Sequence, residues 1–408
     1  MVITKNRADI IQDIKEPEDR GESISLIEPL CISATARSRT QLNDLALTLA
    51  AKNAGLHQSL PPKLVPAIAT LVRGMNCYYS NLIEGHDTHP IDIERALNND
   101  YSPDIKKRNL QLEAKAHIRV QEWLDNGSLK GRVATSSSLQ EIHRKFYELL
   151  PDELLWTNDP KNETRIRVTP GELRHRDVRV GHHVPVSPGA VRRFLTKFEQ
   201  VYQNLGLTET IINAASAHHR LLWIHPFLDG NGRVARLFSH AALMEALGEG
   251  GLWSIARGLA RNESRYKELL INCDASRRND LDGRGNLSEE ALVEFSSFFL
   301  EICLDQVTFM NDLIQPGRLK DRILSWAERQ NLPAKSGRLL AAIIYRGGEI
   351  SRKEAAETLD LGERQTRRIL LPLIKQGILN SENPRSPLCL KFPAQLADQW
   401  LPGLFPEK

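Results

Sequence analysis

The 408-residue sequence predicts a mainly α-helical protein with one β-hairpin and a separate small unit near its C-terminal end. Apolar residues recur every three or four positions over most of the chain, which is typical of amphipathic helices. Only residues 164–188 differ, because they alternate, are rich in valine and arginine, and contain Pro-Gly and Gly181. That pattern predicts the hairpin. The segment "QPGR" at 315–318 marks the start of the separate unit.

Composition excludes several classes of protein. Charged residues make up 26% and hydrophobic residues 41%, as in soluble globular chains. The net charge is only +3, so any basic patch for nucleic acid must be local. No apolar run approaches the roughly 18 residues of a membrane span, and no signal peptide begins the chain, so we expect no membrane partner. Five scattered cysteines without metal or redox spacing indicate reduced thiols in a cytoplasmic protein.

We divide the chain at changes in pattern. Residues 1–40 are expected to form a partly ordered arm, and 41–125 a helical region broken at 60–66 and 87–90. Residues 126–314 form the expected core. In that core, "SSSLQEIHRKFYELL" is a helix that serine caps. The acidic spacing of the loop at 280–290 does not fit a calcium site, so its serine is also expected to cap a helix.

The first helical region ends with a question of charge. Glu84 lies in the last turn of a helix that Gly85 closes. A carboxylate near the negative end of a helix dipole costs about 0.3–1 kcal/mol, so Glu84 should meet a cation from elsewhere.

Residues 218–238 predict two helices joined by a short loop. The first should end near Ile224, because Pro226 disfavours the helical conformation of His225. The second should begin near Asn231, and the glycines on either side of Asn231 leave backbone N–H groups open at its N-terminus. Such an arrangement is an anion site.

The side chains around this loop suit nucleotidyl transfer. Arg233 and Arg236 share one face of the second helix and could hold phosphates. Asp229 could hold Mg²⁺ together with phosphate oxygens, and His225 offers a base that titrates near neutrality. Each feature alone also fits a turn, a helix cap, a buried histidine or a solvated face. Their coincidence within twelve residues favours a site.

The segment "HPFLDGNGRVAR", 225–236, resembles the signature of the Fic family of nucleotidyl transferases, His-x-Phe-x-Asp/Glu-Gly-Asn-Gly-Arg-x-x-Arg. The resemblance covers roughly 60–310 and implies a Fic-type helical core with a β-hairpin flap over the site. It implies ATP and Mg²⁺, with His225 as base, Asp229 on the metal and Phe227 packed under the loop. It further implies phosphate contacts from Gly230, Asn231, Gly232, Arg233 and Arg236. The kinase-type variant of this superfamily has lysine at the position of Gly232, so the resemblance is to AMP-transferring members.

The resemblance also supplies a cation for Glu84. Many Fic members carry an inhibitory helix with the pattern Ser/Thr-x-x-x-Glu-Gly/Asn, which "SNLIEG", Ser80 to Gly85, matches. Its place before the core resembles the class II type, in which Glu84 would pair with Arg236. Opposite charges 4 Å apart are worth about 4 kcal/mol at an effective dielectric of 20, before desolvation. The alternative is a surface glutamate without a partner.

Adenine contacts are expected from "ESRYKELLINCD", 263–274, with Tyr266 and Asn272 as candidates. The flap at 164–188 could align a target segment by strand addition.

Residues 330–395 resemble a winged helix-turn-helix: three short helices and a two-stranded wing. The third helix carries Arg364, Gln365, Arg367 and Arg368, which could contact DNA. Pro372 is expected to break that helix midway. DNA contact, dimerisation and target docking are all left open.

The sequence therefore predicts a self-inhibited protein adenylyltransferase that transfers AMP to a Ser, Thr or Tyr hydroxyl of a target protein, and to itself. Two alternatives stay open. One is a nucleotide-sensing DNA-binding regulator with little transferase activity, and the other is a bifunctional enzyme that also removes AMP through Glu84. A homodimer is also open.

Overall fold

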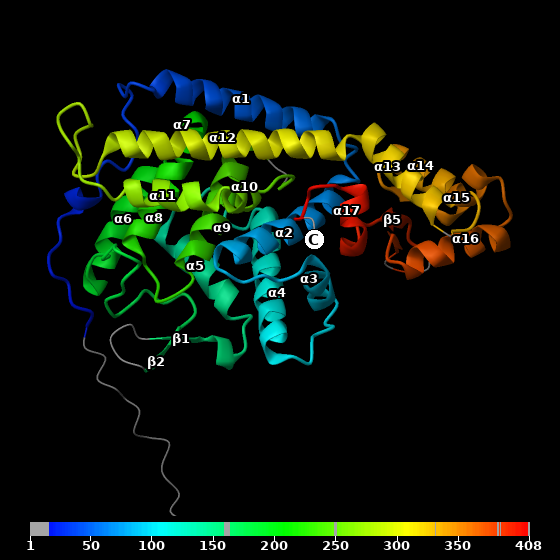
Figure 1. The fold of residues 1–408 in the computed structure, drawn as a ribbon, viewed down its shortest axis with the longest axis horizontal. Coiled ribbons are helices and arrows are strands. Elements are labelled where there is room, and N and C mark those ends of the chain that lie inside the picture. The colour runs from blue at the N-terminus through cyan, green and yellow to red at the C-terminus, as the bar shows by residue number, and fades with distance from the viewer. Residues whose placement is uncertain are drawn as a thin grey trace, which may run out of the picture.

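A computed structural model describes residues 16–158, 164–248, 251–330, 332–381, 383 and 385–406. Residues 1–15 of the expected N-terminal arm and two residues of the expected wing lie outside the described residues. The described chain is mainly helical, as predicted, with one small β-hairpin and a small sheet near the C-terminal end (Figure 1).

The N-terminal helical region breaks where the sequence predicts. Its helices are α1 (Arg39–Gln58), α2 (Val65–Ile83), α3 (Pro90–Leu97) and α4 (Ile105–Asp125). Helix α2 is amphipathic, and its buried stripe includes Ile68, Val72 and Met75. It is followed by Glu84 as C-cap residue and by Gly85 at φ +81°, the left-handed conformation that glycine adopts without strain.

The central core holds the two helices predicted on either side of the loop 225–230. They are α8 (Ala214–Ile224) and α9 (Asn231–Leu247), which pack against each other. Around them lie α5 (Ser136–Tyr147), α6 (Val191–Tyr202), α7 (Leu207–Ile212), α10 (Ile255–Arg261), α11 (Glu263–Asn272) and α12 (Glu289–Ile314). Helix α12 runs beside α1 along one side of the molecule (Figure 1). The cap of α5 is Thr135 rather than a serine, and Ser288 caps α12 as expected.

The described part of the arm, from residue 16 onward, contacts the core through polar side chains. The carboxylate of Glu22 accepts the backbone N–H of Ser187 at 2.8 Å, and Asp19 pairs with Arg193 at 2.8 Å. Ile27, in the short 3₁₀ helix η1 (Ile24–Ile27), is fully buried. Polar residues on this segment find partners more than 150 positions away, which local patterning cannot reveal.

The hairpin lies earlier in the chain than predicted. Strands β1 (Trp156–Asn158) and β2 (Arg165–Arg167) pair antiparallel, with Thr157 opposite Ile166. From residue 168 to 187 the described chain has no strand beyond an isolated bridge between Val180 and His183. The prediction of a hairpin over 164–188 was therefore wrong for most of that segment, which runs along the end of α8 and uses its polar side chains there.

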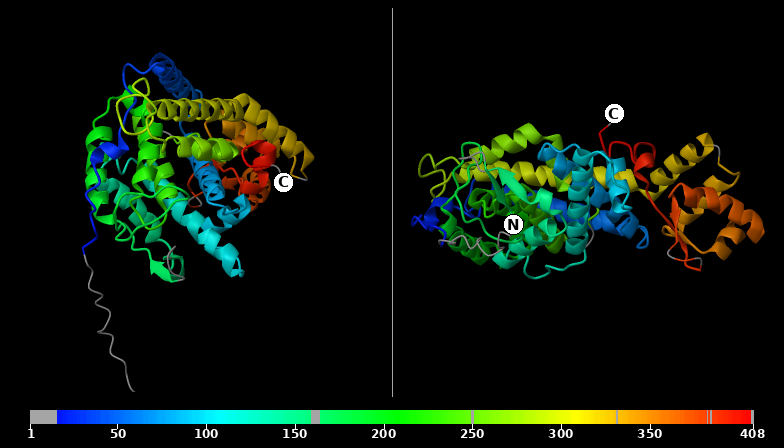
Figure 2. Two further views of the ribbon diagram at one scale, coloured as in Figure 1. Left: turned by 60° about the vertical axis from the view of Figure 1, so that its left-hand side comes forward. Right: turned by 90° about the horizontal axis from the view of Figure 1, so that it is seen from below.

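The C-terminal unit projects from the core at the far end of α12 (Figure 2). It contains α13 (Pro316–Arg329), α14 (Ser336–Tyr345), α15 (Arg352–Leu359), α16 (Glu363–Lys375) and strands β3 (Glu349–Ile350), β4 (Leu379–Asn380) and β5 (Leu388–Leu390). The three predicted helices are present, and the sheet has three strands in the order β3-β5-β4 instead of two. Helix α16 continues through Pro372, so the predicted break is wrong. Pro372 lies only three residues before the helix ends, and the proline therefore removes a hydrogen bond from the last turn alone.

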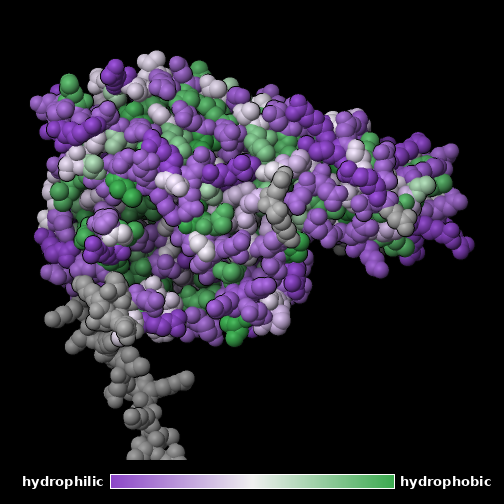
Figure 3. All heavy atoms as spheres, in the orientation of Figure 1, coloured by the Kyte–Doolittle hydropathy of each residue, from purple (hydrophilic) through white to green (hydrophobic). Residues whose placement is uncertain are grey.

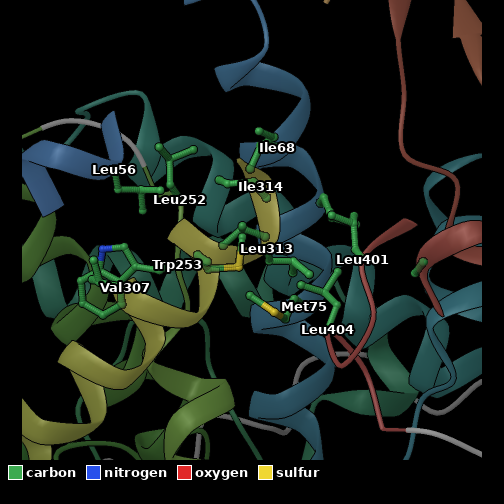
Figure 4. Packing of buried hydrophobic residues seen from close by; sticks show 14 of the residues in the cluster. Leu56, Ile68, Met75, Leu252, Trp253, Val307, Leu313, Ile314, Leu401 and Leu404 are labelled. Atoms are coloured by element: carbon green, nitrogen blue, oxygen red, sulfur yellow. The ribbon is translucent and has the colours of Figure 1, made fainter. Parts of the chain in front are cut away.

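The last described residues return from this unit to α2. After η4 (Ala394–Leu396) and α17 (Ala397–Trp400), Leu401 and Leu404 pack into the core beside Met75 and Leu313 (Figure 4). The hydroxyl of Tyr79 donates to the carbonyl of Leu404 at 3.1 Å. The C-terminal segment thus contacts the same helix that carries Ser80 one residue further along.

All five cysteines are free thiols. Among the described residues, none of the helices combines the length and apolar character needed to cross a membrane.

Candidate active site

The corner between α8 and α9 is built from unusual backbone conformations. Helix α8 ends at Ile224, and His225 adopts the left-handed conformation at φ 51°. Gly230, at φ 78°, forms the N-cap of α9. Pro226 explains why His225 leaves the helical conformation, as predicted. The first i→i−4 hydrogen bond of α9 runs from Val234 N–H to Gly230 O. The amides that precede Val234 in the first turn therefore have no i→i−4 partner within the helix.

Asn231 has a different contact from the one expected. Its side-chain oxygen accepts the N–H of Phe227 at 3.0 Å, and its side-chain nitrogen donates to the carbonyl of Phe227 at 2.9 Å. The side-chain amide of Asn231 is therefore bonded to the backbone of the loop itself. Phe227 is fully buried and stacks on His143 at 4.0 Å between ring centres, as expected for a residue packed under the loop.

Other side chains approach both glycines of the loop. A Cβ atom on Gly230 would lie 2.8 Å from the Tyr147 ring, and the φ of Gly230 is positive, so this position favours glycine. A Cβ atom on Gly232 would lie 2.5 Å from Oε1 of Glu84, so a side chain there would have to displace the carboxylate. The carboxylate of Glu84 therefore sits directly against the first turn of α9.

Asp229 belongs to a network that the sequence did not reveal in full. Its Oδ2 accepts a hydrogen bond from the Tyr147 hydroxyl at 2.7 Å and from Arg233 at 3.2 Å. Arg233 also pairs with Glu113 of α4 at 3.4 Å and lies over the Phe146 ring. Burial raises the pKa of Asp229, but Arg233 and the Tyr147 hydroxyl outweigh it and hold that pKa below its usual value. Asp229 is therefore an anion at neutral pH, and its side chain is 46% exposed.

His225 is half-buried at the mouth of the loop. Burial, and after it the positive charge of Arg174, lowers the pKa of His225 to about 4. The sequence had suggested a base that titrates near neutrality, and the pKa of His225 lies below that range. At pH 7 the imidazole is neutral and can accept a proton, and negative charge brought beside it would raise its proton affinity.

Glu84 pairs with a cation from elsewhere in the chain, Arg236. Nη2 of Arg236 donates to Oε1 of Glu84 at 2.5 Å and to the carbonyl of Ser80 at 3.2 Å. Nε of the same guanidinium donates to the Ser80 hydroxyl at 2.9 Å. The Arg236 side chain is only 4% exposed and that of Glu84 is 35% exposed. Burial raises the pKa of Glu84, and Arg236 more than compensates, so the pKa lies below its ordinary value.

The two candidates for adenine contact do not line the loop. Tyr266 is 3% exposed, and its hydroxyl bonds Nε2 of His218 at 2.7 Å inside the core. Asn272 lies at the end of α11, and no hydrogen bond or ion pair of the described residues joins it to residues 225–236. The structure brings Tyr266 behind Arg236, where its ring is packed and unavailable for stacking on a base.

Sequence reasoning missed three residues that shape this site: Tyr147, Glu113 and Arg174. The first two support Asp229 and Arg233 from α5 and α4. Arg174 comes from the segment mistaken for a hairpin, and its Nε donates to the carbonyl of His225 at 2.7 Å. Arg174 is one of several arginines in that segment, and nothing in the sequence distinguishes it from the others.

Fold and site together are those of a helical protein with a glycine-containing loop at a helix N-terminus and a neutral histidine beside it. Comparison with known families agrees, since residues 134–243 match the model of the Fic/DOC family. The matched segment runs from just before α5 into α9 and includes the loop 225–230.

Particular relatives match over part of their length. Protein adenylyltransferase Fic of Drosophila erecta is 40% identical over 78 residues, covering 19% of this chain and 16% of the relative. The namesake of Drosophila persimilis is 28% identical over 171 residues, covering 41% of this chain and 31% of the relative. The chain thus matches less than a third of these relatives' own length. A Fic domain containing signaling protein from Bacteroides thetaiotaomicron shares the fold, with a TM-score of 0.50 and 20% identity over 66% of this chain and 96% of that one.

Proposed function

We propose that this chain is a protein adenylyltransferase. In the proposed reaction, His225 takes the proton of a Ser, Thr or Tyr hydroxyl, and the oxygen attacks the α-phosphorus of ATP. The bond from the α-phosphorus to the bridging oxygen breaks, pyrophosphate leaves, and AMP stays on the target. The observation that carries the proposal is the neutral imidazole of His225 beside the first turn of α9, in a segment that matches the Fic/DOC model.

The chain's own residues fit a magnesium nucleotide. Among the described residues no cluster of three or more His, Cys, Asp or Glu side chains could hold a metal alone. Asp229 offers one anionic oxygen next to the anion site, and Mg²⁺ commonly binds one or two carboxylates together with substrate phosphates. We therefore assign Asp229 to the metal, which would neutralise phosphate charge during transfer. Arg233 and the amides of Gly232 and Asn231 would bind the phosphates.

The contact between Glu84 and Arg236 supports the proposal that the enzyme is self-inhibited. With Glu84 in place, Arg236 has its hydrogen bonds directed to α2 instead of a γ-phosphate. The carboxylate also puts negative charge against Gly232, where phosphate oxygens would lie. ATP would have to displace a hydrogen-bonded ion pair, and we propose that it binds without the geometry for transfer.

Incubation with ATP labelled on the α-phosphate tests both parts. We expect weak self-labelling by the wild type, strong labelling by Glu84→Gly and intermediate labelling by Glu84→Gln, which keeps the size but not the charge of the side chain. Adding His225→Ala to Glu84→Gly should abolish the label. If Glu84→Gly stays silent with candidate target proteins present, the transferase proposal is wrong and a nucleotide sensor is favoured.

Charge distribution favours a second candidate function for the C-terminal unit, contact with DNA. Residues 330–395 hold eleven Lys and Arg against six Asp and Glu, whereas the whole chain has a net charge of only +3. A groove of about 750 Å³ lies between α15, α16 and the sheet. Its lining includes Arg352, Lys353 and Arg367. The face of this unit drawn in Figure 3 is largely hydrophilic.

Fluorescence anisotropy with a DNA duplex tests this second function. Replacing Arg367 and Arg368 by alanine should weaken binding and reduce its salt dependence, because two phosphate contacts are lost. Arg318→Ala, outside the groove and paired with Asp312, is the matched control. Equal affinity for wild type and double variant would favour a protein-docking role.

A further inference from the structure

The segment 168–187 has little regular structure, but its side chains converge on the end of α8. Nε2 of His183 donates to the carbonyl of Trp223 at 2.8 Å. Arg174 donates to the next two carbonyls, that of Ile224 from Nη2 at 3.4 Å and that of His225 from Nε at 2.7 Å. The last carbonyls of an α-helix have no intrahelical partner. Here the segment 168–187 supplies the hydrogen-bond donors for these carbonyls.

Arg174 is among the largest fully buried side chains of the protein, at 1% exposure. Its guanidinium also donates to the carbonyls of Arg176 and Val186, and its backbone N–H donates to the carbonyl of Pro226 at 2.8 Å. Arg174 therefore bonds the backbone of the residue before His225 and of the residue after it. All of these partners are backbone carbonyls, and the side chain makes no direct ion pair among the described residues.

His225 needs such support for two reasons. A residue with a side chain rarely adopts the left-handed conformation unless surrounding contacts impose it. The N–H of His225 donates to the carbonyl of Leu221, but Pro226 has no N–H and can add no second backbone bond to the helix end. The positive charge of the Arg174 guanidinium also interacts favourably with the negative, C-terminal end of the α8 dipole.

We propose that Arg174 is a positioning residue: its guanidinium fixes the backbone corner that aims the His225 imidazole at the target hydroxyl. This inference deepens the proposed transferase function and rests on it. The two residues lie 51 positions apart, and the irregular segment between β2 and α6 serves to bring Arg174 to this corner.

Electrostatics support the same assignment. The titratable and charged groups that face His225 are Arg174 and His183 from this segment and Asp229 from the loop. After burial, Arg174 is the largest influence on the pKa of His225, and it lowers that pKa. The pKa of Arg174 itself is lowered to about 10 by burial, so the guanidinium is charged at neutral pH.

Kinetics of the uninhibited Glu84→Gly enzyme test the proposal. Adding Arg174→Met should lower kcat by about 100-fold, the effect of misplacing a catalytic group by about 1 Å, with KM for ATP changed less than about threefold. Arg174→Lys keeps the charge and should recover part of kcat. The acidic limb of the pH profile should move upward in the Met variant, toward the ordinary histidine pKa near 6.5, and stay in place in the Lys variant.

Arg220→Met is the matched control. Arg220 is fully buried on helix α8, and its guanidinium bonds the carbonyls of Pro29 and Cys273 and Nδ1 of His219, none of which belongs to the loop 225–230. It should lower stability without lowering kcat more than about threefold. An Arg174→Met enzyme whose kcat equals that of Arg220→Met would overturn the proposal, as would a loss confined to KM.

A second measurement does not depend on activity. The His225 imidazole can be titrated by nuclear magnetic resonance in histidine-labelled protein and assigned by its absence in His225→Gln. Its pKa should rise in Arg174→Met and stay unchanged in Arg220→Met. If Glu84→Gly transfers no AMP, the proposed function fails on its own, and this titration still decides whether Arg174 controls His225. An unchanged His225 titration in Arg174→Met would refute that control.

Discussion

Single residues in the loop 225–232 are chosen for backbone and steric reasons as much as for chemistry. Gly230 is favoured by its positive φ and by the nearby Tyr147 ring, and at Gly232 the absence of a side chain leaves room for the carboxylate of Glu84. The sequence suggested Asn231 as a phosphate ligand, and its side chain hydrogen-bonds the backbone of Phe227. Part of the motif 225–236 therefore serves to form the corner between α8 and α9.

At the inhibitory contact, Ser80 should matter nearly as much as Glu84. Ser80 is fully buried and accepts Nε of Arg236. Ser80→Ala leaves that N–H without a partner, which costs about 1–3 kcal/mol. We expect self-labelling to rise by about fivefold over wild type but to stay below Glu84→Gly. Thr70→Ala, at an exposed position of the same helix, should change nothing, and a Ser80→Ala rate equal to wild type would argue against the prediction.

Inhibition should be insensitive to pH over the neutral range. Because the pKa of Glu84 is lowered by Arg236, its ionised form persists above the ordinary value of 4.5, and the contact weakens only as pH falls through the lowered pKa. We expect the ratio of Glu84→Gly to wild-type initial rates to stay constant within about twofold from about pH 5.5 to 8.5. A ratio that falls steadily from pH 8 to 6 would contradict this.

Helices and strands show which local rules hold. Pro226 and Gly85 end α8 and α2 where expected, and capping residues start α5 and α12. Alternation over 164–188 did not make a long hairpin, because strands need a pairing partner and this segment meets the end of α8 instead. The sequence of residues 164–188 does not indicate that the end of α8 is the neighbour.

The Ser288 cap offers a test at the scale of one helix. Its hydroxyl accepts the N–H of Ala291 at 3.1 Å and donates to Asp282 at 2.8 Å. Ser288→Ala should lower the free energy of unfolding by about 1–2 kcal/mol, measured by urea denaturation. Ser137→Ala, an exposed serine at the start of α5, should have less than about 0.5 kcal/mol of effect. Equal losses in the two variants would show that Ser288 does not act as the cap.

In the whole molecule, α2 is held from two directions. Its C-terminal end contacts α9 through Arg236, and its buried face receives the C-terminal segment of the chain. The ring of Phe405 packs edge-on against Tyr78 at 5.6 Å between centres, and Arg257 donates to the carbonyl of Gly403 at 2.7 Å. The C-terminal segment of the chain therefore packs on the same helix whose C-terminal end contacts α9.

Leu404→Ala tests how much that junction contributes. Leu404 is fully buried, and its truncation should cost about 2–5 kcal/mol in stability, from lost burial and the cavity left beside α2. Thermal or urea unfolding measures the change. Leu281→Ala, at a side chain 97% exposed, should be nearly neutral. A loss under about 1 kcal/mol for Leu404→Ala would show that the segment packs only loosely.

The sequence by itself determined the corner at His225, the start of α9 and most helix boundaries. These depend on interactions within one or two turns of chain, through Pro226, Gly230 and the capping residues. The resemblance carried by the motif, and not any local rule, suggested that Glu84 would meet Arg236. Tertiary structure alone decided that Arg174 supports His225, that Tyr147 and Glu113 fix Asp229 and Arg233, and that residues 16–38 are bound to the core. Each of these contacts joins residues tens to hundreds of positions apart, and such contacts form only when packing of the helices brings the two segments together.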